Sequence, residues 1–103
     1  MTHTGIKLIQ LERDHQIYDC GKTIEFDIEH NSNSELTCAI MMLIANVELN
    51  RQGIKMPPDA FQDLKPKEWS NSACWKLLEK SEIDQLKIIG SFAAAEIDRL
   101  QSL

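Results

Sequence analysis

The sequence predicts an all-α protein, a compact helical bundle of three main helices with short minor helices between them. Apolar residues recur at three- and four-residue spacing in 5–20, 33–51 and 81–103, which is the spacing of one helix face. Residue types that cap helices stand at the ends of these stretches. The one segment with strand-like alternation, 22–33, has no partner strand elsewhere in the sequence.

The totals describe an ordinary globular domain. The chain has 103 residues, of which 43% are hydrophobic and 26% are charged, and we expect a single domain over 1–103. The net charge of −5 argues against binding nucleic acid or an anionic membrane without help, because both require a basic face. Binding of a small anionic ligand is still possible if lysine or arginine side chains, or a metal ion, are grouped at one place.

The cysteines and the absence of recognisable leader or nucleophile motifs limit the function classes further. Cys20, Cys38 and Cys74 are odd in number and form no CxxC pair, so we expect neither a disulfide framework nor a zinc site. We see no secretion signal and no run of about 20 apolar residues, and we expect a cytoplasmic protein without membrane contact. No P-loop, G-x-S-x-G or Cys–His nucleophile pattern is visible, so nucleophilic catalysis has no candidate.

The first helix and the segment after it are bounded by clear signals. Thr4 is placed to cap a helix over 5–20, and Gly21 stands where a helix C-terminus favours a left-handed residue. We interpret the alternation in 22–33 as an extended connection packed on the helices.

The second helix is predicted over 33–51. Ser32 and Glu35 form a capping-box pattern ahead of it, and Gly53 ends it. Its predicted buried face is made of Leu36, Ile40, Leu43 and Val47. Three prolines in 54–73 exclude a long helix there, so only short helical turns are expected in this middle excursion.

The third main helix begins after Ser81, which is placed to cap it. Small residues in 90–95 permit the close approach of a second helix. We expect its buried face to consist of Leu86, Gly90, Ala93, Ile97 and Leu100.

Several polar residues have both a functional and a structural interpretation. Glu12, His15 and Gln16 share one helix face, which is half of a carboxylate-bridged metal site or, as we prefer, a solvated face. Glu35 is equally well explained as a metal ligand or as part of the capping box.

Two further groups have the same ambiguity. Asp84 and Lys87 hold a phosphate or pair with each other on the surface, and the surface pair is the simpler interpretation. Glu96 is expected to form a structural ion pair with Arg13 across the bundle. His30 is interpreted as a surface histidine.

Five short motifs follow one another along the chain: LIQLERDHQ, GKTIEFDIEH, SEL, WK and LKIIGSFAAAEIDRL. Their order resembles small phage and prophage MazG-like proteins, a group placed near the all-α NTP pyrophosphohydrolases. The resemblance covers most of the chain except 50–68. The matching residues are Glu12, Arg13, Gln16, Gly21, Thr23, Glu25, Asp27, His30, Glu35, Leu36, Trp75, Lys76, Leu86, Lys87, Gly90, Ala95, Glu96, Ile97, Arg99 and Leu100.

The resemblance implies a metal site that this sequence preserves only in part. Members of the broader superfamily hydrolyse nucleoside triphosphates with Mg²⁺ held by E-x-x-E and E-x-x-D. Carried over to this chain, the metal ligands are Glu12, Glu35 and Asp84, with Arg13 and Lys87 for phosphate and Gln16, His30 and Glu96 in support. Departures from the pattern weaken the site: Ser32 replaces the first acid, Lys87 replaces the last, and Phe26 and Ile28 replace His and Asp.

Three functions stay open at this point. The first, slightly preferred, is a phage-type MazG-like protein that binds a nucleotide or another phosphorylated ligand without catalysis. The second is a Mg²⁺-dependent nucleoside triphosphate pyrophosphohydrolase, a hydrolase of acid anhydrides. The third is a non-enzymatic oligomerisation module. We expect a homo-oligomer, either a dimer or a tetramer, and a polar cleft shared by the acids and Lys87.

Overall fold

The computed structural model describes residues 3–103, and every regular element within them is helical. The elements in chain order are α1 (Gly5–Asp14), the π-helical turn η1 (His15–Asp19), α2 (Ile24–His30), α3 (Glu35–Arg51), the 3₁₀ turn η2 (Pro58–Phe61), α4 (Asn71–Leu78) and α5 (Glu82–Gln101). The all-α prediction is therefore confirmed. No helix in the described part of the chain is long and apolar enough to cross a membrane.

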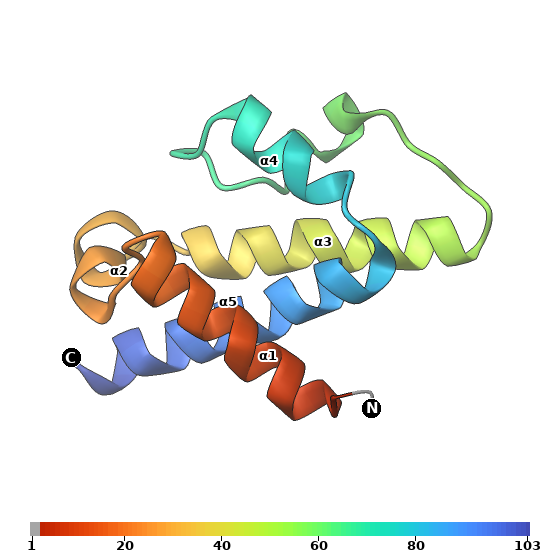
Figure 1. Ribbon diagram of the computed structural model, residues 1–103. Helices are drawn as coiled ribbons and strands as arrows, with labels where there is room; N and C mark the ends of the chain where they lie inside the picture. The colour runs from red at the N-terminus through yellow and green to blue at the C-terminus, as the bar shows by residue number, and fades with distance from the viewer. Residues whose placement is uncertain (1–2) are drawn as a thin grey trace.

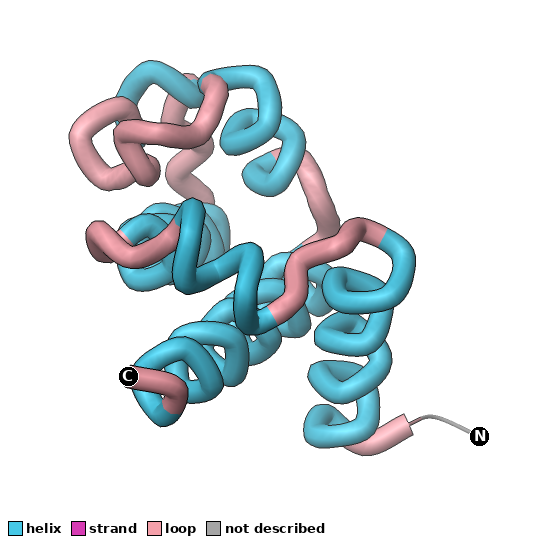
Figure 2. Tube along the Cα trace, turned by 90° about the vertical axis from the view of Figure 1, so that its left-hand side faces the viewer, coloured by secondary structure: helices cyan, strands magenta, loops and turns pink. Residues whose placement is uncertain are grey.

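The two longest helices, α3 and α5, form the centre of the molecule. They run side by side in opposite directions, and α1 crosses over α5 (Figure 1). Figure 2 shows that α4 and the excursion before it lie on the far side of α3 from α5. The core between these elements is built from Met42, Leu43, Phe61, Cys74 and Ile88.

Local signals set most helix ends as the sequence predicts. Thr4 Oγ1 accepts a hydrogen bond from Lys7 N at 3.2 Å, and Ser81 Oγ accepts one from Asp84 N at 3.1 Å. Gly21 has a φ of +70°, a left-handed conformation that suits glycine after a helix. These ends fix the lengths of α1–η1 and α5.

The predicted extended connection over 22–33 is wrong, because most of it is the helix α2. Thr23 caps this helix by accepting from Phe26 N at 3.2 Å. Its single buried residue is Asp27, whereas Ile28 is 40% exposed. The alternation of apolar residues therefore did not predict the conformation of this segment. The segment forms a seven-residue helix whose buried residue is polar.

The capping box predicted at Ser32 is not formed. Helix α3 begins after Ser34, whose φ is +71° and whose side chain makes no capping bond. The Glu35 carboxylate accepts from Asn33 N at 2.6 Å, so it caps the preceding loop and not Ser32. The predicted inner face of this helix is confirmed at Leu36, Leu43 and Val47, and Ile40 is half-buried.

The predicted buried face of α5 is also wrong. Leu86, Ile97 and Leu100 are 37%, 55% and 51% exposed. The buried face consists of Gln85, Ile88, Ser91, Ala95 and Arg99. Its polar members are tolerated because each finds a hydrogen-bond partner: Asn46 for Gln85, Gln16 for Ser91 and Glu96 for Arg99.

The expected close approach at the small residues of α5 is confirmed at Gly90. A Cβ atom added there would lie 2.5 Å from Ile9 Cδ1, so α1 fits against α5 only because this position lacks a side chain.

Candidate functional site

A cavity of about 590 Å³ opens between α1–η1, α2, α4 and α5. Its size lies within the range of roughly 300–1,000 Å³ that is usual for small-molecule sites. Aliphatic and aromatic side chains from α3, α4 and α5 line one part of it, and polar side chains from α1, η1 and α2 line the rest, among them the buried Arg13, Gln16 and Asp27. The polar and charged lining residues are Glu12, Arg13, His15, Gln16, Lys22, Asp27, His30, Asn31, Glu68, Ser70 and Lys80.

A chain of hydrogen bonds connects α2 to the segment before α4 along one side of the cavity. Asn31 Nδ2 donates to Asp27 Oδ1 at 2.7 Å, and Trp69 Nε1 donates to Asn31 Oδ1 at 3.1 Å. The Trp69 ring meets the Phe92 ring edge-on, with 5.6 Å between their centroids. Trp69 therefore holds the excursion against the bundle and also presents an aromatic wall to the cavity.

Asp27 is the least satisfied polar group of the cavity. The residue is only 2% exposed, and its Oδ2 atom has no hydrogen-bond partner within residues 3–103. Burial raises the pKa of this carboxyl, and the Asn31 hydrogen bond and the charges of Arg13 and Lys22 offset the rise in part. A buried oxygen without a partner costs about 1–3 kcal/mol, so a ligand that donates to it would recover that cost.

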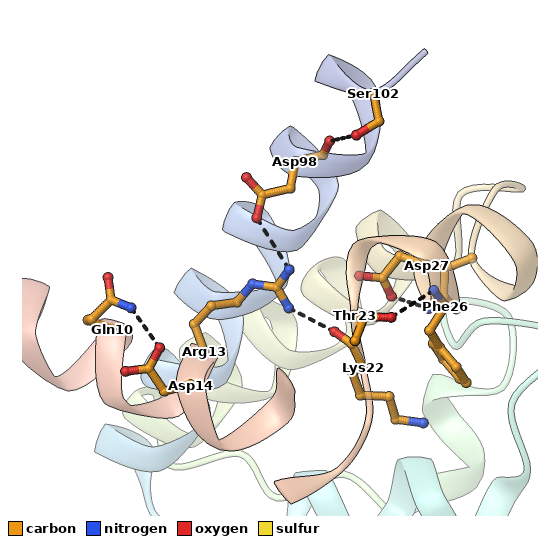
Figure 3. A network of polar contacts seen from close by, with 10 residues as sticks. Gln10, Arg13, Asp14, Lys22, Thr23, Phe26, Asp27, Asp98 and Ser102 are labelled. Carbon is orange, nitrogen blue, oxygen red and sulfur yellow. Dashed lines mark hydrogen bonds and ion pairs between the residues drawn. The ribbon is translucent and has the colours of Figure 1, made fainter. Parts of the chain in front are cut away.

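Arg13 is held beside Asp27 by contacts with two other segments. Its Nη2 lies 3.3 Å from Asp98 Oδ2, and its Nη1 donates to Lys22 O at 3.2 Å (Figure 3). Its Nε is buried and also lacks a partner within the described chain. The expected pairing of Arg13 with Glu96 is wrong, because Glu96 forms a two-bond ion pair with Arg99 at 2.6 and 3.1 Å.

Cations and aromatic rings meet at the opening of the cavity. Lys22 Nζ lies 4.1 Å above the centroid of the Phe26 ring, and the His30 ring, one turn further along α2, packs against Phe26 at a tilt with 4.4 Å between the two ring centroids. Lys80 contributes a second lysine to the lining. This opening therefore presents positive charge next to flat apolar surface.

The residues predicted from the first helix and from the loop motif do come together. Glu12, Arg13, Gln16 and His30 all line the cavity. Gln16 is fixed by two hydrogen bonds, which it donates to Glu12 Oε2 at 3.2 Å and to Ser91 Oγ at 2.7 Å. Glu12 is thereby held at the rim.

The remaining predicted site residues lie elsewhere. Glu35 is buried at the start of α3 and does not line the cavity. Asp84 and Lys87 pair with each other at 3.2 Å, and Lys87 borders a smaller apolar groove between α1 and α5. The hydrogen bond from Lys87 and a second from the Ser81 side chain hold the pKa of Asp84 below its usual value.

The expected single cleft around the acids and Lys87 is therefore corrected by the structure. Within residues 3–103 no three His, Cys, Asp or Glu side chains are grouped so that they could hold a metal ion. Glu12, Glu35 and Asp84 lie on three different helices whose facing surfaces do not bring the carboxylates together. What gathers instead is Arg13, Gln16 and the unpredicted Asp27.

Sequence reasoning missed Asp27, Asn31, Lys22 and Trp69 as members of this site. A usable signal existed for α2, because Thr23 followed by acids in the first turn is a helix start. Once α2 is helical, Asp27 and Asn31 fall on the same face by their spacing of four. No local signal predicts that this face meets Trp69, which is 38 residues away from Asn31.

Comparisons of the chain with protein-family models, with curated proteins and with solved structures find no match. The cavity and its contacts are therefore the basis on which a function is assigned.

Proposed function

We propose that this protein binds a nucleotide, with the base inside the cavity and the phosphate at its opening. The observation that carries this proposal is the pairing of two buried, unpartnered polar atoms, Asp27 Oδ2 and Arg13 Nε, with an aromatic wall in one cavity. A ligand that supplies hydrogen-bond donors and acceptors on a flat apolar frame satisfies both features.

The inner part of the cavity suits a base. Trp69 and Phe92 offer aromatic surface, and Ile88 and Leu77 complete an apolar wall. Asp27 Oδ2 and the amide of Asn31 stand beside this wall and can receive and offer hydrogen bonds along the edge of a base. An exocyclic amino group would be a suitable donor to Asp27.

The opening suits a phosphate. Lys22 and Lys80 supply two ammonium groups, and His30 adds an imidazole. Glu12 and Glu68 line the same cavity, and their charge limits how many phosphates are accepted without an accompanying cation. We therefore favour a monophosphate over a triphosphate as the preferred ligand.

The resemblance to MazG-like proteins supports a nucleotide over other flat anions, since that superfamily acts on nucleotides. It also raises the alternative of a Mg²⁺-dependent nucleoside triphosphate pyrophosphohydrolase. Binding without this reaction is the better supported of the two, because Glu12 alone of the three expected ligands lines the cavity.

The assembly state that we propose is a homodimer through the outward side of α3 and α5. Ile97 and Leu100 are exposed on α5, and Met41 and Ile44 are exposed on α3. The Arg51–Glu82 ion pair at 2.9 Å bridges the two helices on this side, and Ile44 lies two turns before Arg51.

The area of this outward side is adequate for a second copy. The 17 residues of α3 and 20 of α5 give lengths of roughly 25 and 30 Å. Two helices about 10 Å wide then present a footprint of roughly 500 Å² per protomer, within the range of small specific interfaces. The exposed polar residues of α3 are Thr37 and, near its end, Glu48, Asn50 and Arg51, so the middle of its exposed side is apolar.

The binding proposal is tested by calorimetry with nucleoside mono-, di- and triphosphates, with and without Mg²⁺. We compare Lys22→Gln with the matched variant Lys87→Gln, because both remove one lysine charge beside a helix. The expected result is about a tenfold loss of affinity in Lys22→Gln, the value of one charge-assisted contact, and unchanged affinity in Lys87→Gln. Absence of binding by any nucleotide, or equal losses in both variants, contradicts the proposal.

The enzymatic alternative has its own test in the same samples. Pyrophosphate release from a triphosphate that requires Mg²⁺ and disappears in Glu35→Gln would establish hydrolysis and displace the simple binding function. We expect no such release.

A further inference from the structure

A thiol, an imidazole and a carboxylate stand in contact at η1. His15 Nδ1 lies 2.8 Å from Asp19 Oδ2, and His15 Nε2 lies 3.6 Å from Cys20 Sγ. All three residues are exposed. The expectation from sequence that the chain lacks a Cys–His nucleophile is therefore corrected.

The π-helical turn explains why sequence spacing did not reveal this group. In a π-helix the N–H of residue i+5 bonds to the carbonyl of residue i, and Cys20 N donates to His15 O at 3.2 Å. Asp19 and Cys20, four and five positions after His15, thus both lie one turn after it. Asp19 contacts one nitrogen of its ring and Cys20 contacts the other. An ordinary α-helix would carry Cys20 past that face.

The contacts from Asp19 to His15 and from His15 to Cys20 favour one tautomer of the imidazole. An ionised Asp19 carboxylate only accepts hydrogen bonds, so it favours the proton of His15 on Nδ1. The lone pair of Nε2 is then directed at the thiol, and a base held by a third group is the arrangement that activates a nucleophile. π-Helical turns are themselves frequent at functional sites.

The thiol and its base also have a place for a substrate beside them. Cys20 and His15 both line the 590 Å³ cavity. The same cavity contains the buried Asp27, whose Oδ2 has no partner in the described chain, so an unfilled polar contact exists in the cavity that the thiol lines. This second observation separates Cys20 from an ordinary surface cysteine.

We propose that Cys20 is a nucleophile that accepts an acyl group from an ester or thioester held at the cavity opening. His15 is the general base and Asp19 is a positioning residue. The bond from Sγ to the acyl carbon forms, and the bond from that carbon to the leaving oxygen or sulfur breaks. The thiol proton passes to His15 Nε2 and then to the leaving group, so no oxidant or reductant is needed. This chemistry does not depend on the proposed nucleotide.

The first test measures alkylation of Cys20 by iodoacetamide in the full chain, read by peptide mass spectrometry. Exposure alone speeds alkylation, so the alkylation rate of Cys20 is compared between variants and not with the rates of the other two cysteines. We expect its rate to fall about tenfold or more in His15→Gln and in Asp19→Asn, and to recover in Asp19→Glu. The matched control His3→Gln alters an exposed histidine that does not line the cavity and should leave the rate unchanged.

The second test uses p-nitrophenyl acetate. The wild-type protein should release one equivalent of p-nitrophenolate and gain one acetyl group on Cys20, and Cys20→Ser should do neither. Equal Cys20 alkylation rates in wild type and His15→Gln overturn the role of His15. Rapid alkylation without acetylation of Cys20 overturns the acyl chemistry. Circular dichroism confirms that each variant is folded, and Asp19→Asn supplies the comparison if His15→Gln is not.

Discussion

Two charged regions border α5, and they differ in how much water they retain. Near its start, Asp84 and Lys87 pair with each other at the surface. Further along, Arg13, Asp27 and Arg99 are buried with their partners, and two of their polar atoms have no partner in the described chain. Both regions look alike in sequence, as charges at helical spacing. Only the polar groups of the second region are shielded from water. A ligand that bonds to its unpartnered atoms can therefore contribute substantial binding free energy only there.

The largest expected effect separates a buried ion pair from an exposed one. Arg99→Ala leaves the Glu96 carboxylate partly buried without its two-bond partner, and we expect the free energy of unfolding to fall by about 3 kcal/mol. Lys87→Ala breaks a pair of the same spacing that is more exposed, with side chains 26% and 49% exposed, and should cause a loss of less than about 1 kcal/mol. Urea denaturation measures both, and equal losses would remove the distinction between the two regions.

Asn31→Ala should have the next largest effect. Asn31 is 3% exposed and connects Asp27 to Trp69, so its loss leaves two further groups without a partner. We expect about 2 kcal/mol less stability and a changed Trp69 fluorescence, because the indole N–H is released. Unchanged fluorescence would show that this hydrogen-bond chain does not hold Trp69 in solution.

The two aspartates should respond to pH with opposite signs. Burial raises the pKa of Asp27 in the folded state above its ordinary value of 3.8. The stability that it contributes is present below that value and is lost as the pH rises through the folded-state pKa. Compared with Asp27→Asn, the wild-type protein should therefore lose stability as the pH rises from about 4.

Asp84 provides the contrast. Its pKa is lowered, chiefly by the hydrogen bond from Lys87, so its contribution is present above 3.8 and is lost as the pH falls. Thermal unfolding of Asp27→Asn and Asp84→Asn across pH 3–7 measures both slopes. Slopes of the same sign would contradict the difference in solvation.

The smallest effect on the stability of one protomer is expected on the outward side of α3 and α5. Ile97→Glu places a charge on a side chain that is 55% exposed, so the fold should tolerate it. If that side is the dimer interface, light scattering should show a dimer for wild type and a monomer for the variant. Ile6→Glu changes an isoleucine that is 84% exposed on α1 and should remain dimeric.

Much of the fold was predictable because its signals are local. Capping at Thr4 and Ser81 and the glycine after η1 set the ends of α1–η1 and α5, and the spacing of Leu36, Leu43 and Val47 gave the inner face of α3. The buried side of α5 was not predictable in this way. It carries two competing stripes, and the more polar one is buried because Gln85 and Ser91 find partners on other segments and Arg99 pairs with Glu96 on α5 itself.

The site was predictable only where it depends on one helix. Glu12 and Gln16 follow from their spacing along α1 and η1, and Arg13 was expected only from the resemblance to MazG-like proteins. The approach of Asp27 to Arg13 and the packing of Trp69 on Phe92 depend on how distant segments meet, which no local pattern encodes. The contact of Cys20 with His15 needed the π-helical turn, for which the sequence has no recognised signal.

The two tryptophans allow the most direct test of a nucleotide in this cavity. Trp69 lines the cavity, whereas Trp75 does not, and each indole N–H gives a separate signal in a nitrogen–proton correlation spectrum. Titration with a nucleoside monophosphate should shift the Trp69 indole signal in a saturable way and leave the Trp75 signal in place. Movement of neither signal, or of both alike, would contradict a nucleotide bound between Asp27 and the aromatic wall.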